Sequence, residues 1–242
     1  MLRESAGVRL RNQPARGGRP AQHEGGPVNG SGGGVPVALI DYGMGNLRSV
    51  LRALEKTGGN VRIAREPAET AGAAALVFPG QGAIVDAMRE IRRTGFDAFI
   101  KDWIAADKPF FGVCLGLQML FEHSEEGGVP GLGVFRGNVR RFENSRERKV
   151  PHMGWNTISV RRENAGTLAE GIEPEGESFY FVHSYYVETP EKDIVWSETE
   201  YGVRFVSAVR RGNVFATQFH PEKSQAKGLK LYENFLRAAA NA

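Results

Sequence analysis

The sequence predicts an α/β fold with a mostly parallel central sheet and an antiparallel extension. In the first half of the chain, short apolar runs alternate with segments of helical periodicity, an order typical of parallel strands connected by helices. In the second half, strand-like segments follow one another with only turn-like connections, which favours antiparallel pairing. Residues 224–240 carry apolar side chains on one helical face and predict a closing helix.

The elements of the first half are predicted from their local patterns. Residues 37–40 are a continuous apolar run, as expected of a strand that is buried on both faces. Residues 46–56 have apolar side chains on one face and are followed by two glycines, which predicts a helix that ends there. By the same criteria, further strands are predicted at 61–63, 74–78 and 109–113, and further helices at 83–93, 96–106 and 114–121.

The second half contains further strand-like segments between turn-forming residues. They lie at 139–142, 157–160, 179–187, 203–209 and 214–219. The connections between them leave little room for helices, so we expect this part of the chain to form the antiparallel extension.

Residues 1–34 differ in composition from the rest of the chain. They are rich in glycine and arginine and have little apolar content. Such a segment cannot bury enough surface to offset the entropy that is lost on ordering, so we predict a disordered tail. The folded domain is predicted to span residues 35–242.

The charge distribution argues against a dedicated nucleic-acid binder. The formal net charge is +3, and residues 1–34 account for all of it because they hold five arginines and two glutamates. Residues 35–242 are neutral and lack the basic surface that such binders need. No apolar run approaches the roughly 18–20 residues of a membrane span. We therefore expect neither nucleic acid nor a membrane as partner.

The cysteine and histidine content limits the chemistry further. A single cysteine excludes internal disulfides and favours the reducing cytoplasm as the location. The five histidines occur without Cys-x-x-Cys or His-Glu-x-x-His spacing, so no metal site is expected. We expect no cofactor.

The segment around the single cysteine predicts a nucleophile. Gly112, Cys114 and Gly116 form a Gly-x-Cys-x-Gly pattern between a predicted strand and a predicted helix, the thiol form of the nucleophile elbow. The sharp turn strains the cysteine backbone, and the two glycines leave room for neighbouring main chain. The helix start favours a thiolate, and the N–H of Leu115 is placed to stabilise an oxyanion. The alternative is a buried structural cysteine, the commoner role of a single cysteine.

A histidine and a carboxylate near the C-terminus are candidates for activating this thiol. An apolar strand ends at His220, and Glu222 follows two residues later. Pro221 between them restricts the backbone, so that a turn can bring the carboxylate back to the imidazole. Cysteine, histidine and carboxylate together form a catalytic triad. The alternative is that His220 only ends a strand and Glu222 is a solvated turn residue.

Together these motifs resemble a known family. Residues 111–118 and 218–222 are similar to the cysteine and histidine motifs of the class I glutamine amidotransferases. Three further stretches resemble one branch, the glutaminase subunits of imidazole glycerol phosphate synthase: Asp-Tyr-Gly-Met-Gly-Asn-Leu-Arg-Ser-Val at 41–50, Pro-His-Met-Gly-Trp-Asn at 151–156 and Phe-Val-His-Ser-Tyr-Tyr at 181–186. The resemblance covers residues 36–242 and implies a three-layer, class I glutaminase-like α/β fold.

The resemblance also implies a reaction. Cys114 would attack the side-chain amide of glutamine, His220 would protonate the departing ammonia and then activate water, and Glu222 would orient His220. By the same resemblance, the oxyanion hole and the glutamine site are expected at Gly80, Gln81, Gly82, Leu115, Gln118, Ser184 and Tyr185. Many members of the family have valine at the position of Gln81, so the donor assignment in the oxyanion hole stays open. For His183, a structural role in a strand is as well supported as a contact with substrate.

A partner subunit is implied as well. In the family, the tryptophan and lysine that match Trp155 and Lys223 lie near a cyclase subunit with a (β/α)₈ barrel fold. The expected assembly is a heterodimer in which ammonia passes to the cyclase, which makes imidazole glycerol phosphate for histidine synthesis. The alternatives are a core tryptophan and a solvated lysine. We expect low glutaminase activity without the partner.

Three other functions stay open at this point. Another class I glutaminase, of pyridoxal phosphate, aminodeoxychorismate or anthranilate synthesis, would share the triad but lack the stretches at 41–50 and 151–156. A cysteine peptidase or esterase could use a similar elbow. A non-catalytic regulatory subunit could use the basic tail to contact nucleic acid.

Overall fold

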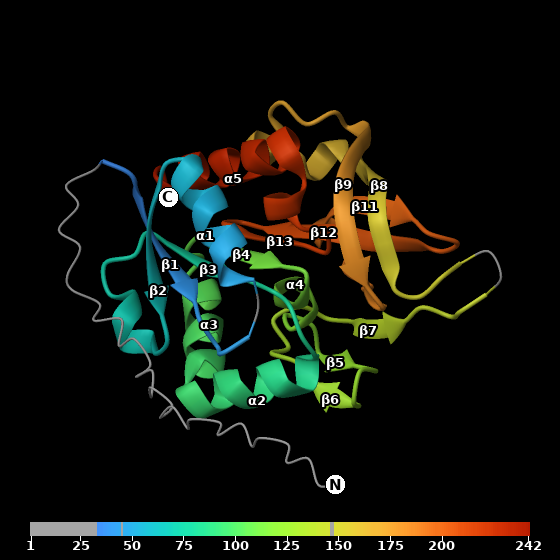
Figure 1. The fold of residues 1–242 in the computed structure, drawn as a ribbon, viewed down its shortest axis with the longest axis horizontal. Coiled ribbons are helices and arrows are strands. Elements are labelled where there is room, and N and C mark those ends of the chain that lie inside the picture. Colours follow the sequence, from blue (N-terminus) through green and yellow to red (C-terminus); the bar gives the residue numbers. More distant parts are fainter. Residues whose placement is uncertain (1–32, 45, 146–147) are drawn as a thin grey trace, which may run out of the picture. The chain divides into compact units, whose positions relative to one another are not determined.

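The computed structural model describes residues 33–44, 46–145 and 148–242 (Figure 1). The predicted tail at 1–34 lies almost entirely outside the described residues, and it stays a prediction. Within the described part, the strands form one thirteen-stranded sheet. The sheet has a parallel half and an antiparallel half, as the sequence predicts.

The parallel half is built from the strands of the first half of the chain and one late strand. In spatial order it contains β2 (Gly59–Ala64), β1 (Val35–Ile40), β3 (Ala75–Phe78), β4 (Phe110–Val113) and β13 (Val214–Thr217). All of these neighbours pair in parallel. The late strand was expected in the antiparallel extension. β13 pairs antiparallel with the strand before it in the chain and parallel with β4. The parallel pairing places the carboxyl ends of β13 and β4 side by side.

The antiparallel half continues from β13 and then branches. The main path runs through β12 (Arg204–Arg211), β10 (Tyr185–Glu188), β7 (Asn138–Arg141), β5 (His123–Ser124) and β6 (Val129–Pro130). The branch consists of β11 (Val195–Glu200), β8 (His152–Val160) and β9 (Glu175–His183). The predicted strand at 179–187 is therefore two strands separated at Ser184, and β5, β6 and β11 were not predicted.

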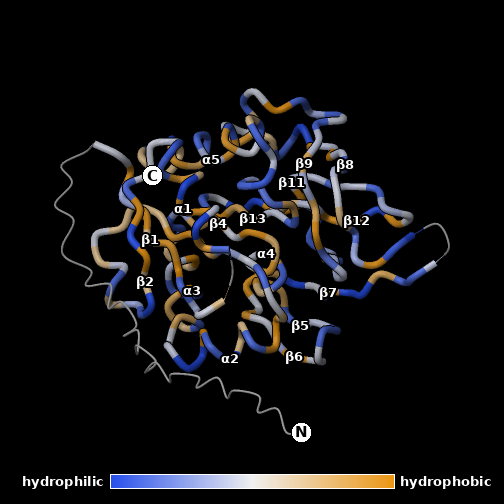
Figure 2. The backbone as a smooth tube through the Cα atoms, viewed as in Figure 1, coloured by the Kyte–Doolittle hydropathy of each residue, from blue (hydrophilic) through white to orange (hydrophobic). Residues whose placement is uncertain are grey.

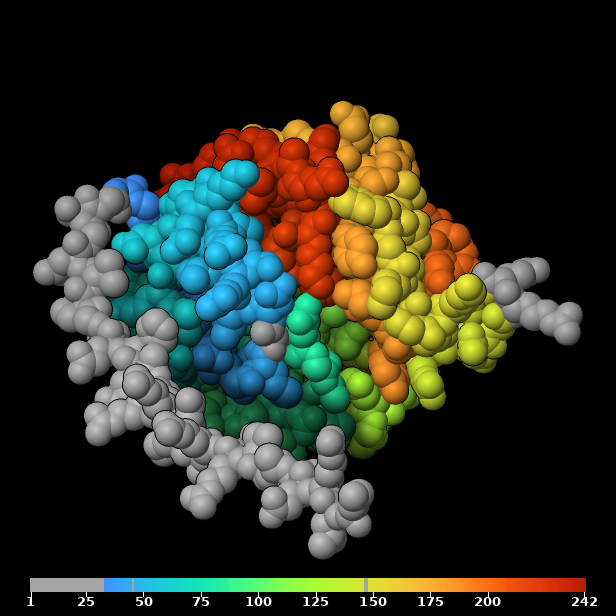
Figure 3. Space-filling view, viewed as in Figure 1, coloured from blue at the N-terminus to red at the C-terminus, as the bar shows by residue number. Residues whose placement is uncertain are grey.

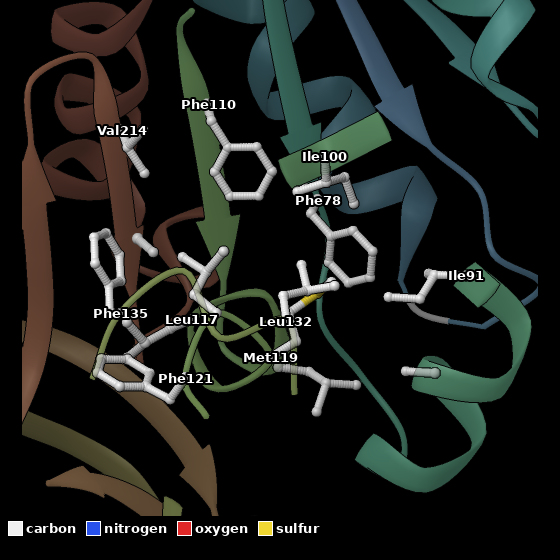
Figure 4. Packing of buried hydrophobic residues seen from close by; sticks show 14 of the residues in the cluster. Phe78, Ile91, Ile100, Phe110, Leu117, Met119, Phe121, Leu132, Phe135 and Val214 are labelled. Atoms are coloured by element: carbon white, nitrogen blue, oxygen red, sulfur yellow. The ribbon is translucent and has the colours of Figure 1, made fainter. Parts of the chain in front are cut away.

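The two faces of the parallel half are covered by different helices. Alternate side chains of β1 separate into two buried clusters, with Ala38 and Ile40 in one and Val37 and Leu39 in the other. The first cluster includes residues of α2 (Ile84–Thr94) and α3 (Phe96–Ala105), and Figure 4 shows its large side chains closely packed. The second includes residues of α1 (Leu47–Lys56) and α5 (Gln225–Ala239). The predicted three-layer arrangement is confirmed.

Burial on both faces explains the continuous apolar runs of the central strands. Figure 2 shows hydrophobic residues concentrated along these inner strands. All four residues of both β3 and β4 are buried. Among the helices of the described residues, none is both long enough and apolar enough to cross a membrane.

The helix after the cysteine is shorter than predicted. α4 spans only Leu115–Gln118, although the sequence predicts a helix to about residue 121. The carbonyl groups of Met119, Leu120 and Phe121 accept hydrogen bonds from the main chain of residues 132–135 instead of from a continuing helix. Residues 119–121 therefore form a loop that pairs with residues 132–135 instead of the predicted end of the helix.

Candidate active site

The cysteine lies on a strained turn between β4 and α4. Cys114 has a φ of 50°, a conformation that non-glycine residues rarely adopt. A Cβ atom at Gly112 would lie 2.6 Å from the carbonyl oxygen of Gly116, and one at Gly116 would lie 2.8 Å from that of Phe78. Both positions therefore need glycine, as the elbow pattern predicts.

The pairing of β4 with β13 brings the C-terminal histidine to this turn. Thr217 lies opposite Val113 in the parallel register, and the Cys114 N–H donates to the Thr217 carbonyl at 2.6 Å. The chain then continues to His220, whose N–H donates to the carbonyl of Tyr180 at 2.9 Å. In Figure 3 the C-terminal segment (red) lies between α1 (blue) and the strands β8 and β9 (yellow and orange). Residues more than a hundred positions apart thus meet at one edge of the sheet.

The histidine is paired with the predicted carboxylate. Nδ1 of His220 lies 2.8 Å from Oε1 of Glu222, and the two side chains are only 1% and 2% exposed. Within the described residues, neither Nε2 of His220 nor Oε2 of Glu222 makes a hydrogen bond. The ring therefore has one nitrogen bound to the carboxylate and the other available for chemistry.

The thiol and the imidazole influence each other electrostatically. Burial alone would lower the pKa of His220, but the charge of the Cys114 thiolate and the contact with Glu222 raise this pKa to about 9. At neutral pH His220 is therefore an imidazolium, with the sulfur of Cys114 beside it and Glu222 bound to its other nitrogen. This is the charge arrangement of an activated cysteine nucleophile.

The thiol opens into a cavity of about 430 Å³. Its lining includes these residues expected from sequence: Gly80, Gln81, Gly82, Cys114, Leu115, Gln118, Ser184, Tyr185, His220 and Lys223. It also includes Glu126, Pro151, Val182 and His183, which were not predicted as site residues. Glu222 is not part of the lining and lies behind the imidazole.

Trp155, a predicted partner contact, is not among the residues that line the cavity. Trp155 lies on β8 and is half exposed, and Met153 on the same strand is 61% exposed.

Glu126, which was not predicted, lines the cavity and also binds the start of α2. Its Oε2 accepts a hydrogen bond from the N–H of Ile84 at 3.0 Å. The two partners of this bond are 42 residues apart, so no local pattern could have revealed it.

The predicted oxyanion segment packs directly against the elbow. A Cβ atom at Gly80 would collide with the Val113 carbonyl oxygen and the Leu115 nitrogen, so only glycine fits. The N–H of Gln81, however, donates to the hydroxyl of Tyr42 at 3.3 Å, and that hydroxyl donates to the Gln81 carbonyl at 3.0 Å. In this conformation the Gln81 N–H is engaged with Tyr42.

Two further buried histidines lie next to each other, and one of them, His183, lines the cavity. Nδ1 of His152 lies 2.9 Å from Nε2 of His183, and Nδ1 of His183 lies 2.7 Å from the carbonyl oxygen of Tyr185. Burial lowers the pKa of His152 to about 4 and that of His183 to about 3, so both rings are neutral. Since both nitrogens of His183 face protein groups, its ring supports the main chain around Ser184.

Comparisons with known proteins show which family the chain belongs to. The family model described as Glutamine amidotransferase class-I matches residues 38–239. The chain is 52% identical over 209 residues to "Imidazole glycerol phosphate synthase subunit HisH" of Aromatoleum aromaticum, covering 83% of this chain and 97% of that protein. It is also 50% identical over 203 residues to the protein of the same name in Rhodopirellula baltica, covering 84% and 97%.

Solved structures share the fold at lower identity. One, described as a glutamine amidotransferase, has a TM-score of 0.63 at 24% identity and covers 86% of this chain and 100% of its own. The glutaminase domain of Trypanosoma brucei CTPS with bound acivicin has a TM-score of 0.56 at 17% identity, with 86% and 94% covered. These likenesses support the fold, and the sequence matches identify the family. The chain belongs to the class I glutamine amidotransferases, in the branch of the imidazole glycerol phosphate synthase subunits.

Proposed function

We propose that this chain hydrolyses the side-chain amide of glutamine and delivers the ammonia to a partner subunit. One observation carries the proposal: Cys114 on its strained turn and His220, which is paired with the buried Glu222, line the same cavity. A buried structural cysteine would need neither the strained turn nor a neighbouring histidine whose pKa is raised by the thiolate.

The first half of the reaction forms a thioester. The thiolate of Cys114 attacks the side-chain carbonyl carbon of glutamine, and the carbonyl oxygen takes up the negative charge. The N–H of Leu115 stabilises this oxyanion. The carbon–nitrogen bond then breaks while His220 gives its Nε2 proton to the departing nitrogen, which leaves as ammonia.

The second half restores the enzyme. Neutral His220 takes a proton from a water molecule, and the resulting hydroxide attacks the thioester carbon. The carbon–sulfur bond breaks, glutamate leaves, and the sulfur returns as a thiolate beside the imidazolium. Glu222 keeps the Nδ1 proton of His220 in place through both halves, so that Nε2 is always the nitrogen that exchanges protons.

The cavity suits an amino-acid substrate. Its volume of about 430 Å³ lies within the usual range of small-molecule sites. We assign glutamine binding to Gly82, Gln118 and the main chain around Ser184 and Tyr185, all of which line the cavity. β9 and β10 are separated at Ser184, whose carbonyl accepts a hydrogen bond from the N–H of Phe142 at 3.0 Å.

The second donor of the oxyanion hole would require a change in the Gly80–Gly82 segment. Since the Gln81 N–H donates to Tyr42, it is not free to stabilise an oxyanion at Cys114. We propose that the partner subunit releases this N–H, and that the chain alone therefore hydrolyses glutamine slowly. Such gating would prevent waste of glutamine when no acceptor for ammonia is present.

The proposed partner is a cyclase subunit with a (β/α)₈ barrel, in a cytoplasmic heterodimer that makes imidazole glycerol phosphate for histidine synthesis. The exposed Trp155 ring contacts Tyr180 edge-on, with centroids 6.1 Å apart, and the Lys223 ammonium lies 5.9 Å from the centroid of the same tyrosine. Lys223 also lines the cavity. Tyr180 thus connects the exposed Trp155 on β8 to Lys223 at the cavity. This connection supports placing the partner on the face that carries Trp155.

Ammonia release from glutamine tests the proposal. We expect low turnover by the full chain alone and a strong increase when a cognate cyclase and its ligand are added. The Cys114→Ala variant should bind the cyclase normally but release no ammonia, because the thiol contributes only to chemistry. Failure of the wild-type complex to release ammonia, or undiminished release by the variant, would overturn the proposal.

A further inference from the structure

A chain of buried amide groups leads from the glutamine-binding side of the cavity to the sulfur. Nε2 of Gln118 donates to the carbonyl oxygen of Tyr185 at 3.0 Å and to Oε1 of Gln218 at 3.1 Å. Nε2 of Gln218 in turn lies 3.5 Å from Sγ of Cys114, within hydrogen-bond distance for a sulfur acceptor. Both glutamine side chains are buried, Gln218 completely.

The direction of each amide in this chain is fixed by chemistry. A main-chain carbonyl can only accept hydrogen bonds, so the group of Gln118 that faces Tyr185 must be its nitrogen. The same nitrogen faces Gln218, which must therefore present its oxygen. The nitrogen of Gln218 is then the group that points at Cys114. This resolves the ambiguity of amide orientation without reference to hydrogen positions.

We propose that Gln218 is a further catalytic residue, which donates a hydrogen bond to the thiolate of Cys114, and that Gln118 is a positioning residue that directs this donor. The inference rests on the proposed role of the cysteine as nucleophile. The sulfur has a second neighbour, the Val182 carbonyl at 3.9 Å, which can accept a hydrogen bond only from the protonated thiol. The amide therefore favours the thiolate, and the carbonyl favours the thiol.

The proposal adds a second task to Gln118. A residue that only bound substrate would not need both protons of its amide nitrogen engaged by the protein before substrate arrives. Here both are used, while no hydrogen bond within the described residues engages Oε1 of Gln118. The side chain can thus orient Gln218 through its nitrogen and still accept a hydrogen bond from glutamine through its oxygen.

Alkylation of the single cysteine by iodoacetamide tests the proposal without requiring glutamine. The full chain, followed by intact mass across a pH series, gives the rate at each pH. Gln218→Met removes the donor, and we expect the alkylation midpoint to rise by about 0.7–1 pH unit. Because one unit is a factor of ten in the thiolate fraction below both midpoints, alkylation there should be about five- to tenfold slower. Gln118→Met keeps the amide of Gln218 but removes the group that orients it. This variant should raise the alkylation midpoint by about half as much as Gln218→Met.

A matched control is available elsewhere in the core. Asn234 is also a fully buried amide, which donates to the carbonyls of Leu168 and Glu170 at 3.0 and 2.8 Å. Asn234→Leu should lower stability but leave the alkylation profile at the wild-type midpoint. The titratable groups around the thiol are unchanged in all three variants: Tyr42, Glu126, His183, Tyr185, His220, Glu222 and Lys223.

A folded Gln218→Met chain with the wild-type alkylation profile would overturn the inference. If that variant does not fold, Gln118→Met decides: a wild-type midpoint there overturns the inference, and a raised midpoint supports it. The result is separable from the proposed function. Ammonia release by the wild-type complex tests the function, whereas the alkylation midpoint tests only the donor to Cys114.

Discussion

Replacing Glu222 with glutamine isolates the role of the buried carboxylate. The substitution keeps the size of the side chain and an oxygen that can accept from Nδ1 of His220, but it removes the negative charge. Two unit charges about 4 Å apart interact by about 4 kcal/mol at an effective dielectric constant of about 20. This value sets the upper limit of the effect, because glutamine retains the hydrogen bond.

The expected loss follows from this limit. Since about 1.4 kcal/mol changes a rate tenfold, the complete charge interaction corresponds to roughly a thousandfold change, and we expect kcat to fall about 10²- to 10³-fold. The Michaelis constant for glutamine should stay within about threefold, because Glu222 does not line the cavity. Ammonia release by the complex at saturating glutamine gives kcat.

Glu177→Gln provides the matched control for this substitution. Oε2 of Glu177 lies 2.7 Å from Nζ of Lys227, whose side chain is 41% exposed. This partly exposed ion pair does not line the cavity, so kcat should stay within about twofold of wild type. A kcat for Glu222→Gln within about threefold of wild type, in a chain that folds normally, would refute the assigned role of the carboxylate.

Four further predictions follow from the same geometry. Tyr42→Phe removes the hydroxyl that engages Gln81, so partner-free ammonia release should rise about fivefold, the equivalent of one hydrogen bond of about 1 kcal/mol. Gly112→Ala places a Cβ against rigid main chain and should lower the free energy of unfolding by about 2–3 kcal/mol, measured by urea denaturation. His152→Phe removes a histidine whose pKa is lowered from 6.5 to about 4. Between these pH values the free energy of unfolding should therefore fall less steeply with decreasing pH than in wild type, by up to about 1.4 kcal/mol per pH unit. Trp155→Ala should weaken binding of the cyclase about tenfold or more by titration calorimetry while leaving alkylation of the thiol unchanged.

His152 contributes this stability only in its neutral form. A histidine held neutral in the fold stabilises the protein fully above pH 6.5, and this stability is lost as the pH falls towards the folded pKa. His123→Gln, at an exposed histidine of β5, is the matched control for His152→Phe. Gly72 has open space around it but a φ of +77°, so Gly72→Ala should cost only about 1 kcal/mol. Unchanged basal activity in Tyr42→Phe, or unchanged cyclase affinity in Trp155→Ala, would contradict the corresponding interpretation.

The features that sequence predicts well are local ones. The elbow at Cys114 and the buried strands β1, β3 and β4 depend on residues close together in the chain, and their patterns survive in the structure. The order of strands and helices in the first half is likewise carried by short-range periodicity. The parallel half of the sheet therefore agrees with the prediction, apart from the late strand β13.

The features that sequence misses depend on distant partners. The length of α4 is set by main-chain groups of residues 132–135, which compete for its carbonyls. The division of the predicted strand at 179–187 arises at Ser184, where the chain passes from pairing with β8 to pairing with β7 and β12. The engagement of Gln81 by Tyr42 joins residues 39 positions apart. None of these contacts leaves a periodic trace in the sequence.

Covalent labelling tests the central claim most directly. A glutamine analogue with a chloroketone in place of the amide should attach once per chain to Cys114, with ammonia release by the complex lost in parallel and with glutamine protecting against both. Peptide mapping after partial labelling compares the fraction of Cys114 modified with the fraction of activity lost. Equal fractions are the predicted result. Ammonia release that persists after Cys114 is fully modified, or attachment at another residue, would contradict the account.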